Sequence, residues 1–437
     1  MKNYSKQLLA AVLALAATAA AAQDNGSNSP YSRYGFGLLN DRAGGFNKGM
    51  AGLAYGMRDG KELNPQNPAS YSAIDSLSFL FDIGMSLQFS TLETGGRRVN
   101  AKNTSFDYLT MGFRASRNLG MSLGIIPYST IGYSMSETSR LENGTTGDVT
   151  QTNTYSGEGG LHQVYLGLGW KPFGNFSIGA NVGYLWGDLT HNSYNSFSDA
   201  TIETNRHSYE TDIRSYTADF GIQYEQKLTK QDALTLGLTY GLGHDIDRNA
   251  YYYNQKLTSG SVTSGDTLMA RNAFALPHNF GVGLTWQHAN NLRVGVDYNF
   301  QKWSDVKYPA VGERDGAPYY APATGAFDNR HRVTIGAEYI PNPNGSRWRK
   351  LIRYRMGFSM ATPYARINGQ DGPYDYTASF GVGLPVINRW NNRSIINISA
   401  QYERVQPKIA GQITENYIRL CIGISFNERW FMKWQVE

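Results

Sequence analysis

From Leu77 to Phe426 the chain consists of about fourteen segments of alternating apolar and polar residues. In the first segment, Phe79, Ile83 and Leu87 share one face of an extended strand, and Asp82 and Ser86 share the other. A chain that turns an apolar face outward on every strand cannot be placed in water. The pattern therefore predicts an all-β fold, a transmembrane antiparallel β-barrel of about 14 strands.

The links between these segments are alternately short and long. Short links fall at residues 118–119, 171–175, 227–233 and 288–291, and long polar links fall at 93–105, 134–160, 189–212, 243–278 and 304–330. Barrels of the outer membrane have short periplasmic turns and longer external loops. We therefore expect the first strand to run outward and both termini to be periplasmic.

The N-terminus has the pattern of an export signal. Lys2 and Lys6 precede an apolar run over residues 8–17, and three alanines at residues 20–22 follow. The run is shorter than the roughly 20 residues that a membrane-spanning helix needs. Residues 1–22 are thus predicted to be a secretory signal peptide, with no lipoprotein cysteine at its end, and the destination is the outer membrane of a Gram-negative cell.

Composition excludes several classes. Cys421 is the single cysteine, so no internal disulfide can form, and we expect it on the luminal face. Removing Lys2 and Lys6 leaves 38 basic against 35 acidic residues, a net charge of +3. This small excess predicts no nucleic-acid partner.

Two terminal segments do not alternate. Residues 23–76 are rich in glycine and proline and also carry aromatic residues, so we expect a compact plug in the barrel lumen; the alternative is a disordered tail. The barrel is then assigned to residues 77–426, with a periplasmic tail over 427–437. Trp430, Phe431 and Trp434 of that tail are expected at the membrane interface.

The triplet Asn67-Pro68-Ala69, placed shortly before the first strand, resembles a signature of the FadL family of outer-membrane transporters. The strand number and the N-terminal plug also fit this family, which has PorV-like relatives in type IX secretion. The resemblance implies that a hydrophobic solute passes a pocket beside the plug and leaves sideways through a gap at a kink in the third strand. Here that strand contains Pro127 followed by Tyr128, and proline cannot donate to a sheet ladder. The alternative is a bulge that only curves the wall.

Candidate ligand contacts come from the plug. Arg33 could bind an anionic head group, and Tyr34, Phe36, Leu38 and Leu39 could form the apolar lining of the pocket. Packing of the plug against itself would explain the same residues. We also expect Arg33, Asp41 and Arg42 to pair with charges on the luminal face, because a buried unpaired charge is costly.

The sequence lacks the constellations of an enzyme. The seven histidines show no metal-ligand spacing, and no Gly-x-Ser-x-Gly elbow or phosphate-binding loop is present. His244, Asp245 and Asp247 are read as a solvated cluster at a loop. We expect no catalytic residue, no metal and no cofactor.

The sequence-based hypothesis is passive transport of hydrophobic or amphipathic, fatty-acid-like small molecules through the lumen and a lateral opening near the third strand. The alternative is a barrel scaffold or shuttle that docks an exported or periplasmic protein, as PorV-like relatives do. An open general porin is disfavoured by the plug. Expected partners besides the small molecule are outer-membrane lipids and the barrel-assembly machinery, which reads a terminal amphipathic strand such as residues 417–426.

Overall fold

The computed structural model describes residues 27–141, 149–199, 201–258, 260–345, 347–387 and 393–429. The predicted signal peptide and the three aromatic residues of the predicted tail lie outside the described residues. Residues 427–429 continue the last strand, so this strand runs three residues further than the alternation indicates.

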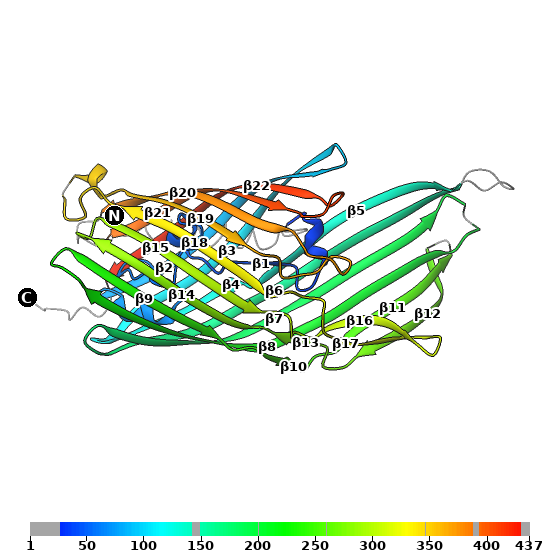
Figure 1. Cartoon of the computed structure of the whole chain (residues 1–437), viewed down its shortest axis with the longest axis horizontal. Helices are drawn as coiled ribbons and strands as arrows, with labels where there is room; N and C mark the ends of the chain where they lie inside the picture. The colour runs from blue at the N-terminus through cyan, green and yellow to red at the C-terminus, as the bar shows by residue number, and fades with distance from the viewer. Residues whose placement is uncertain are drawn as a thin grey trace, which may run out of the picture.

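Fourteen antiparallel strands form a closed barrel, as the alternation predicts (Figure 1). The pairing of the first wall strand with the last closes the ring. The wall strands are β2 (Ser78–Thr94), β3 (Arg97–Ser116), β4 (Leu119–Pro127) continued by β5 (Ser129–Leu141), β6 (Val149–Phe173), β7 (Phe176–Phe197), β8 (Thr204–Lys227), β9 (Asp232–Gly241), β14 (His278–His288), β15 (Leu292–Lys302), β18 (Arg330–Tyr339), β19 (Arg353–Ala361), β20 (Tyr374–Ile387), β21 (Arg393–Gln406) and β22 (Thr414–Arg429).

Apolar side chains face outward around the barrel. On β2, Leu87 and Phe89 are 44% and 40% exposed, whereas Asp82, Ser86 and Ser90 are buried on the inner face. The other wall strands carry similar exposed residues, including Leu166, Phe220, Val282, Ile335, Phe358 and Ile422. Monomeric soluble proteins rarely expose a continuous apolar surface of this extent, so this belt faces the hydrocarbon of a membrane.

On one side the wall continues far beyond the belt. β6, β7 and β8 contain 25, 22 and 24 residues, about twice the 9–11 that cross a bilayer. The extension also includes β11 (Ala250–Thr258), which pairs with β8, and β12 (Ser261–Ala270), which pairs with β11. We call this end of the barrel, on the right of Figure 1, the loop end. The prediction of loops over 134–160 and 189–212 is wrong, because most of both ranges lies in strands. Polar hairpins in water keep their ladders without apolar alternation.

Glycines mark the place where the extension leaves the barrel. Gly160 and Gly187 have φ angles of +135° and +154°, and a Cβ at Gly187 would lie 2.0 Å from the carbonyl oxygen of Gly160. The backbones of β6 and β7 are therefore too close at this point for any side chain at residue 187. Smaller elements fold over the loop end, namely β10 (His244–Ile246) with β13 (Phe274–Leu276), and β16 (Tyr308–Arg314) with β17 (Ala317–Ala323).

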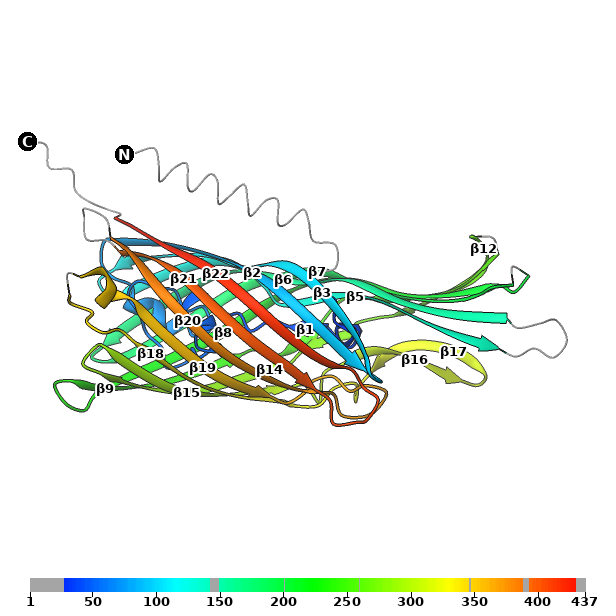
Figure 2. The same ribbon diagram turned by 90° about the horizontal axis from the view of Figure 1, so that it is seen from above.

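Residues 27–76, which we call the luminal segment, lie inside the barrel (blue in Figures 1 and 2). They form η1 (Pro30–Arg33), β1 (Leu38–Leu39), α2 (Gly45–Lys48) and η2 (Pro68–Ala73), joined by turns. The remaining short helix, η3 (Trp348–Leu351), lies between β18 and β19. Within the described residues, the helices are all too short to cross a membrane.

Candidate functional site

The ladder of wall hydrogen bonds is interrupted beside the third strand. β3 pairs with β4 only between Leu109↔Ile125 and Ser116↔Leu119. Beyond Leu109, residues 97–108 of β3 pair with β2, and β5 pairs with β6 and β1; no β3–β5 pairing occurs among the described residues. We call this unpaired line between β3 and β5 the seam.

Two local features produce the seam. Pro127 is the last residue of β4 and has no N–H to donate. The N–H of the next residue, Tyr128, donates to the carbonyl oxygen of Leu161 on β6 at 2.7 Å and is therefore not available to β3. On the opposite side, Asp107 is an extra residue of β3, because Gly84 pairs with Tyr108 and Met85 with Phe106. A bulge bends the strand that carries it. The proline break and the bulge therefore separate the strands from both sides.

The luminal segment occupies the free edge of β5. Its strand β1 pairs Leu38 with Thr130 and Leu39 with Ser129. The N–H of Asn40 donates to the carbonyl of Tyr128 at 3.0 Å, and the N–H of Ser29 donates to the carbonyl of Gly132 at 3.1 Å. β5 thus has a ladder on both edges although it does not pair with β3.

A cavity of about 220 Å³ lies between the luminal segment and the inner wall. Its apolar side adjoins the seam and includes Leu38 of β1, Phe106 of β3, and Ile126 and Pro127 of β4. Its opposite side is charged and is formed by β18, β20, β21 and β22, which carry Arg330, Arg332, Asp375, Glu403 and Arg419. The cavity is therefore amphipathic, and its apolar residues next to the unpaired wall are interspersed with Ser105, Asp107 and Thr130.

The charges around the cavity are paired, but not equally closely. Lys48 Nζ lies 2.9 Å from the Asp107 carboxylate, and Arg419 contacts Glu403 directly. Arg332 is 3.6 Å from Asp41, and Arg330 is 4.0 Å from Asp375. The pair of Lys48 with the bulged Asp107 joins the luminal segment to the edge of the seam.

The predicted ligand contacts fall in two places. Tyr34, Leu38 and Leu39 line the cavity. Phe36 lies in an aromatic cluster at the loop end, with ring centroids 5.7 Å from Trp303 and 6.0 Å from Phe274, and Arg33 stacks over the ring of Tyr155 at 4.2 Å. Of the two predicted gate residues, Pro127 lines this cavity, and Tyr128 lines a smaller cavity beside it.

The triplet Asn67-Pro68-Ala69 forms the start of η2. The Asn67 side chain accepts from the N–H of Ala69 and donates to the carbonyls of Tyr55 and, in the wall, Ile222. The triplet rests on glycines that are register partners across β6, β7 and β8, namely Gly169, Gly179 and Gly221. A Cβ on Gly179 would lie 2.4 Å from the backbone of Pro68, so glycine is required for this contact.

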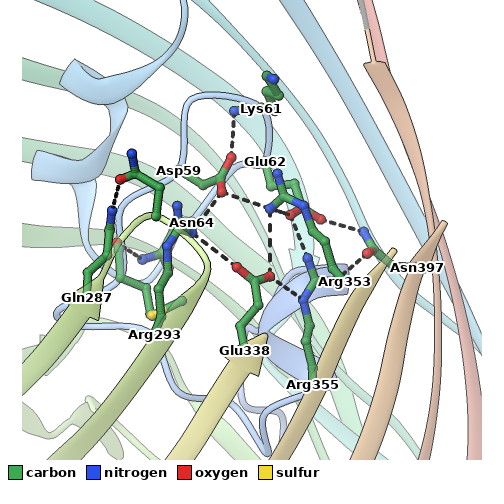
Figure 3. A network of polar contacts seen from close by, with 12 residues as sticks. Asp59, Lys61, Glu62, Asn64, Gln287, Arg293, Glu338, Arg353, Arg355 and Asn397 are labelled. Atoms are coloured by element: carbon green, nitrogen blue, oxygen red, sulfur yellow. Dashed lines mark hydrogen bonds and ion pairs between the residues drawn. The ribbon is translucent and has the colours of Figure 1, made fainter. Parts of the chain in front are cut away.

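A buried ion-pair network, the anchor network, fastens the luminal segment to the opposite wall (Figure 3). Glu62 accepts from Arg353 and Arg355 at 2.7 Å each, and from Asn397 at 2.8 Å. Asp59 accepts from Arg293 and Arg353 at 2.8 Å. Glu338 of β18 completes the set through Arg355 at 2.7 Å. Three carboxylates thus balance three arginines.

On the luminal segment, Arg33, Asp41 and Arg42 were the residues predicted to pair with charges of the wall. Arg42 pairs with Asp219 at 2.9 Å and Asp41 lies near Arg332, as expected for a charged segment in the lumen, while Arg33 stacks on an aromatic ring instead. Asp59 and Glu62 were missed. The signal that could have found them is the short charged run Arg58-Asp59-Gly60-Lys61-Glu62, which lies just before the triplet.

Metal-ligating side chains and the cysteine thiol could form sites of other kinds among the residues that the structure describes. Within the described ranges, no cluster of three or more metal-ligating side chains occurs. Cys421 is buried and faces Ser86 on the inner wall, as expected.

Comparison with solved structures shows the same fold in several channels. The monoaromatic hydrocarbon channel CymD has 13% sequence identity and a TM-score of 0.59, covering 91% of this chain and 100% of that one. A FadL homologue from Pseudomonas aeruginosa has 13% identity and a TM-score of 0.59, covering 88% and 98%. The toluene transporter TbuX of Ralstonia pickettii has 14% identity and a TM-score of 0.57, covering 90% and 99%. The resemblance to FadL-type barrels is thereby confirmed for the fold.

Sequence comparison identifies the family. No curated protein matches the chain. A family model described as BamG matches residues 4–437, nearly the whole length. This outer-membrane β-barrel, FadL-like in fold, belongs to the BamG family.

Proposed function

We propose that the protein carries an amphipathic small molecule between the cavity and the membrane through the seam, while the luminal segment plugs the axial path. The observation that carries this proposal is the position of the cavity. Its apolar residues Leu38 and Pro127 lie next to the seam, where β3 and β5 do not pair among the described residues. Backbone groups in a membrane must be satisfied internally. Strand β1 partners the edge of β5, so the edge of β3 along the seam is the one that needs a lining of protein, water or ligand.

The charged side of the cavity favours an amphipathic ligand over a pure hydrocarbon. CymD and TbuX are a hydrocarbon channel and a toluene transporter. Here Arg330, Arg332 and Asp375 face the cavity, and burying a hydrocarbon against such groups without compensating polar contacts is costly. A molecule with a polar head and an apolar chain satisfies both sides.

Side chains pack against the luminal segment at two levels along the barrel axis. The anchor network holds the luminal segment against β15, β18, β19 and β21, and the loop-end cluster around Phe36 covers it from the other side. Lateral exchange is therefore the route that fits the cavity. In this proposal the short turns and both termini are periplasmic, and the loop end is external.

A second candidate function is a scaffold that docks a protein, in connection with the barrel-assembly machinery or with an exported protein. Membership in the BamG family favours it. The sheet that extends beyond the belt on β6, β7 and β8 offers a large polar surface for such a partner.

One experiment separates the two functions. The protein is extracted from its native membrane in a mild nonionic detergent, and its native mass spectrum is recorded. An adduct of a few hundred daltons that survives gentle activation supports the carrier. A stoichiometric protein adduct with no small molecule supports the scaffold and contradicts the carrier.

A further inference from the structure

The charged side of the cavity contains an ion pair that no hydrogen bond closes. Arg330 Nη2 lies 4.0 Å from Asp375 Oδ2; the two side chains are 15% and 30% exposed, and both residues line the cavity. The pairs Lys48–Asp107 and Arg42–Asp219 close to 2.9 Å. Among the described residues, the guanidinium of Arg330 donates to no acceptor within hydrogen-bond distance. The site therefore has a guanidinium and a carboxylate side by side, and each can form further hydrogen bonds with a ligand.

The lining as a whole is close to neutral. It contains the cations Arg42, Lys48, Arg330, Arg332 and Arg419 and the anions Asp41, Asp107, Asp375 and Glu403. Arg42 is neutralised by Asp219, which lies outside the lining. A ligand with a net charge would leave one charge unbalanced inside the barrel, whereas a ligand that carries both signs preserves the balance.

The cavity is large enough for a polar head group. Its volume of about 220 Å³ is many times the roughly 10–15 Å³ that one water molecule needs on the same measure. An alkyl chain has an exit past Leu38, Ile126 and Pro127, which form the apolar side next to the seam.

We propose that the cavity binds the head group of a zwitterionic amphiphile, with a phosphate on the Arg330 fork, an ammonium on Asp375, and the alkyl chain directed past Leu38 into the membrane. Arginine binds phosphate through two parallel hydrogen bonds, which suits the open fork. The proposal rests on the proposed carrier function, because it names the ligand class of the same cavity.

The test uses four probes with the same twelve-carbon chain. They are dodecylphosphocholine, dodecyl phosphate, dodecyltrimethylammonium and dodecyl maltoside, each titrated into the full-length protein in a nonionic short-chain detergent and followed by native mass spectrometry. We expect dodecylphosphocholine to bind at least tenfold more tightly than each of the other three.

Two variants test the two halves of the site. Arg330→Gln should weaken dodecylphosphocholine and dodecyl phosphate by about tenfold each. Asp375→Asn should weaken dodecylphosphocholine but strengthen dodecyl phosphate, because it removes the competing carboxylate. Arg214→Gln is the matched control, since Arg214 pairs with Asp212 on β8, neither residue lines the cavity, and the change should leave all four affinities unchanged. Heat-modifiable migration on a gel confirms that each variant is a folded barrel.

The outcomes distinguish this inference from the function on which it rests. Binding of dodecyl phosphate as tight as that of dodecylphosphocholine would overturn the zwitterion but keep the carrier. The same holds if Asp375→Asn weakens both phosphate-bearing probes equally. Binding of none of the four probes to the wild-type protein would overturn both.

Discussion

Replacing Glu62 tests how the luminal segment is held. The Glu62 carboxylate is fully buried and accepts hydrogen bonds from Arg353, Arg355 and Asn397 at 2.7–2.8 Å. With Glu62→Gln, three arginines remain against two carboxylates, and the site keeps one uncompensated positive charge. Breaking a buried ion pair by removing one partner costs about 3–5 kcal/mol.

This cost should appear as release of the luminal segment. At about 1.4 kcal/mol for each factor of ten, the released population rises by roughly 100- to 3,000-fold. Hydrogen exchange measured by mass spectrometry on peptides within residues 45–73 reports this population, because their amides exchange when the segment opens. Glu62→Ala should give a similar increase, since the charge dominates the loss.

The control is Asp371→Asn, which removes half of the exposed pair between Lys408 and Asp371. An exposed pair contributes about 0–1 kcal/mol, so exchange over 45–73 should stay within a few-fold of wild type. Suppose that residues 45–73 exchange at the wild-type rate in Glu62→Gln and faster only in Glu62→Ala. This result would refute the charge-balance argument and leave loss of packing as the cause.

Three further predictions follow from the wall contacts. Pro127→Val restores a backbone donor at the seam, so exchange of β3 amides near Phe106 should slow, and so should ligand exchange. Gly179→Val places atoms where the backbone of Pro68 lies, 2.4 Å from the Cβ position, so overpacking of about 1–3 kcal/mol should increase proteolysis of the luminal segment. Burial, and then the charge of Arg33, lower the pKa of His191 from its ordinary 6.5 to about 4. When the contact of His191 with Tyr133 opens, His191 becomes solvated and binds a proton more readily. The free energy that stabilises this contact should therefore fall by up to about 3 kcal/mol as the pH falls from 6.5 to 4.

Each has its own check. Gly174→Val, at a turn where a Cβ meets no atom within 4 Å, controls for loss of glycine as such, although its φ of +49° adds local strain. His191→Phe should abolish the pH dependence of local exchange around Tyr133; persistence of that dependence would assign it to another group. Unchanged exchange near Phe106 in Pro127→Val would leave the bulge at Asp107 as the sole cause of the seam.

The parts predicted from the sequence are those that alternation and single residues encode. The strand count follows from side-chain period, because the membrane selects an apolar residue at every second position. The interruption next to Pro127 follows from its missing N–H. The extended ends of β6, β7 and β8 were assigned to loops, because outside the membrane nothing selects an apolar face.

The anchor network and the glycine row could not be predicted in the same way. Glu62 and Arg355 are 293 positions apart, and their pairing depends on the path of the luminal segment in three dimensions. Gly169, Gly179 and Gly221 look like ordinary strand glycines until strand register places them side by side. The bulge at Asp107 is likewise a property of register that no local pattern indicates.

Contact between the cavity and membrane lipid is the central claim. A photo-crosslinking side chain is placed at Leu38, which lines the cavity; at Leu166, which is exposed on the outer face; and at Met57, which is buried in the luminal segment. After reconstitution in phospholipid vesicles and illumination, mass spectrometry identifies lipid adducts at each position. The account predicts adducts at positions 38 and 166 and none at position 57. Adducts at position 166 alone would show that the seam is closed to lipid and would contradict the account.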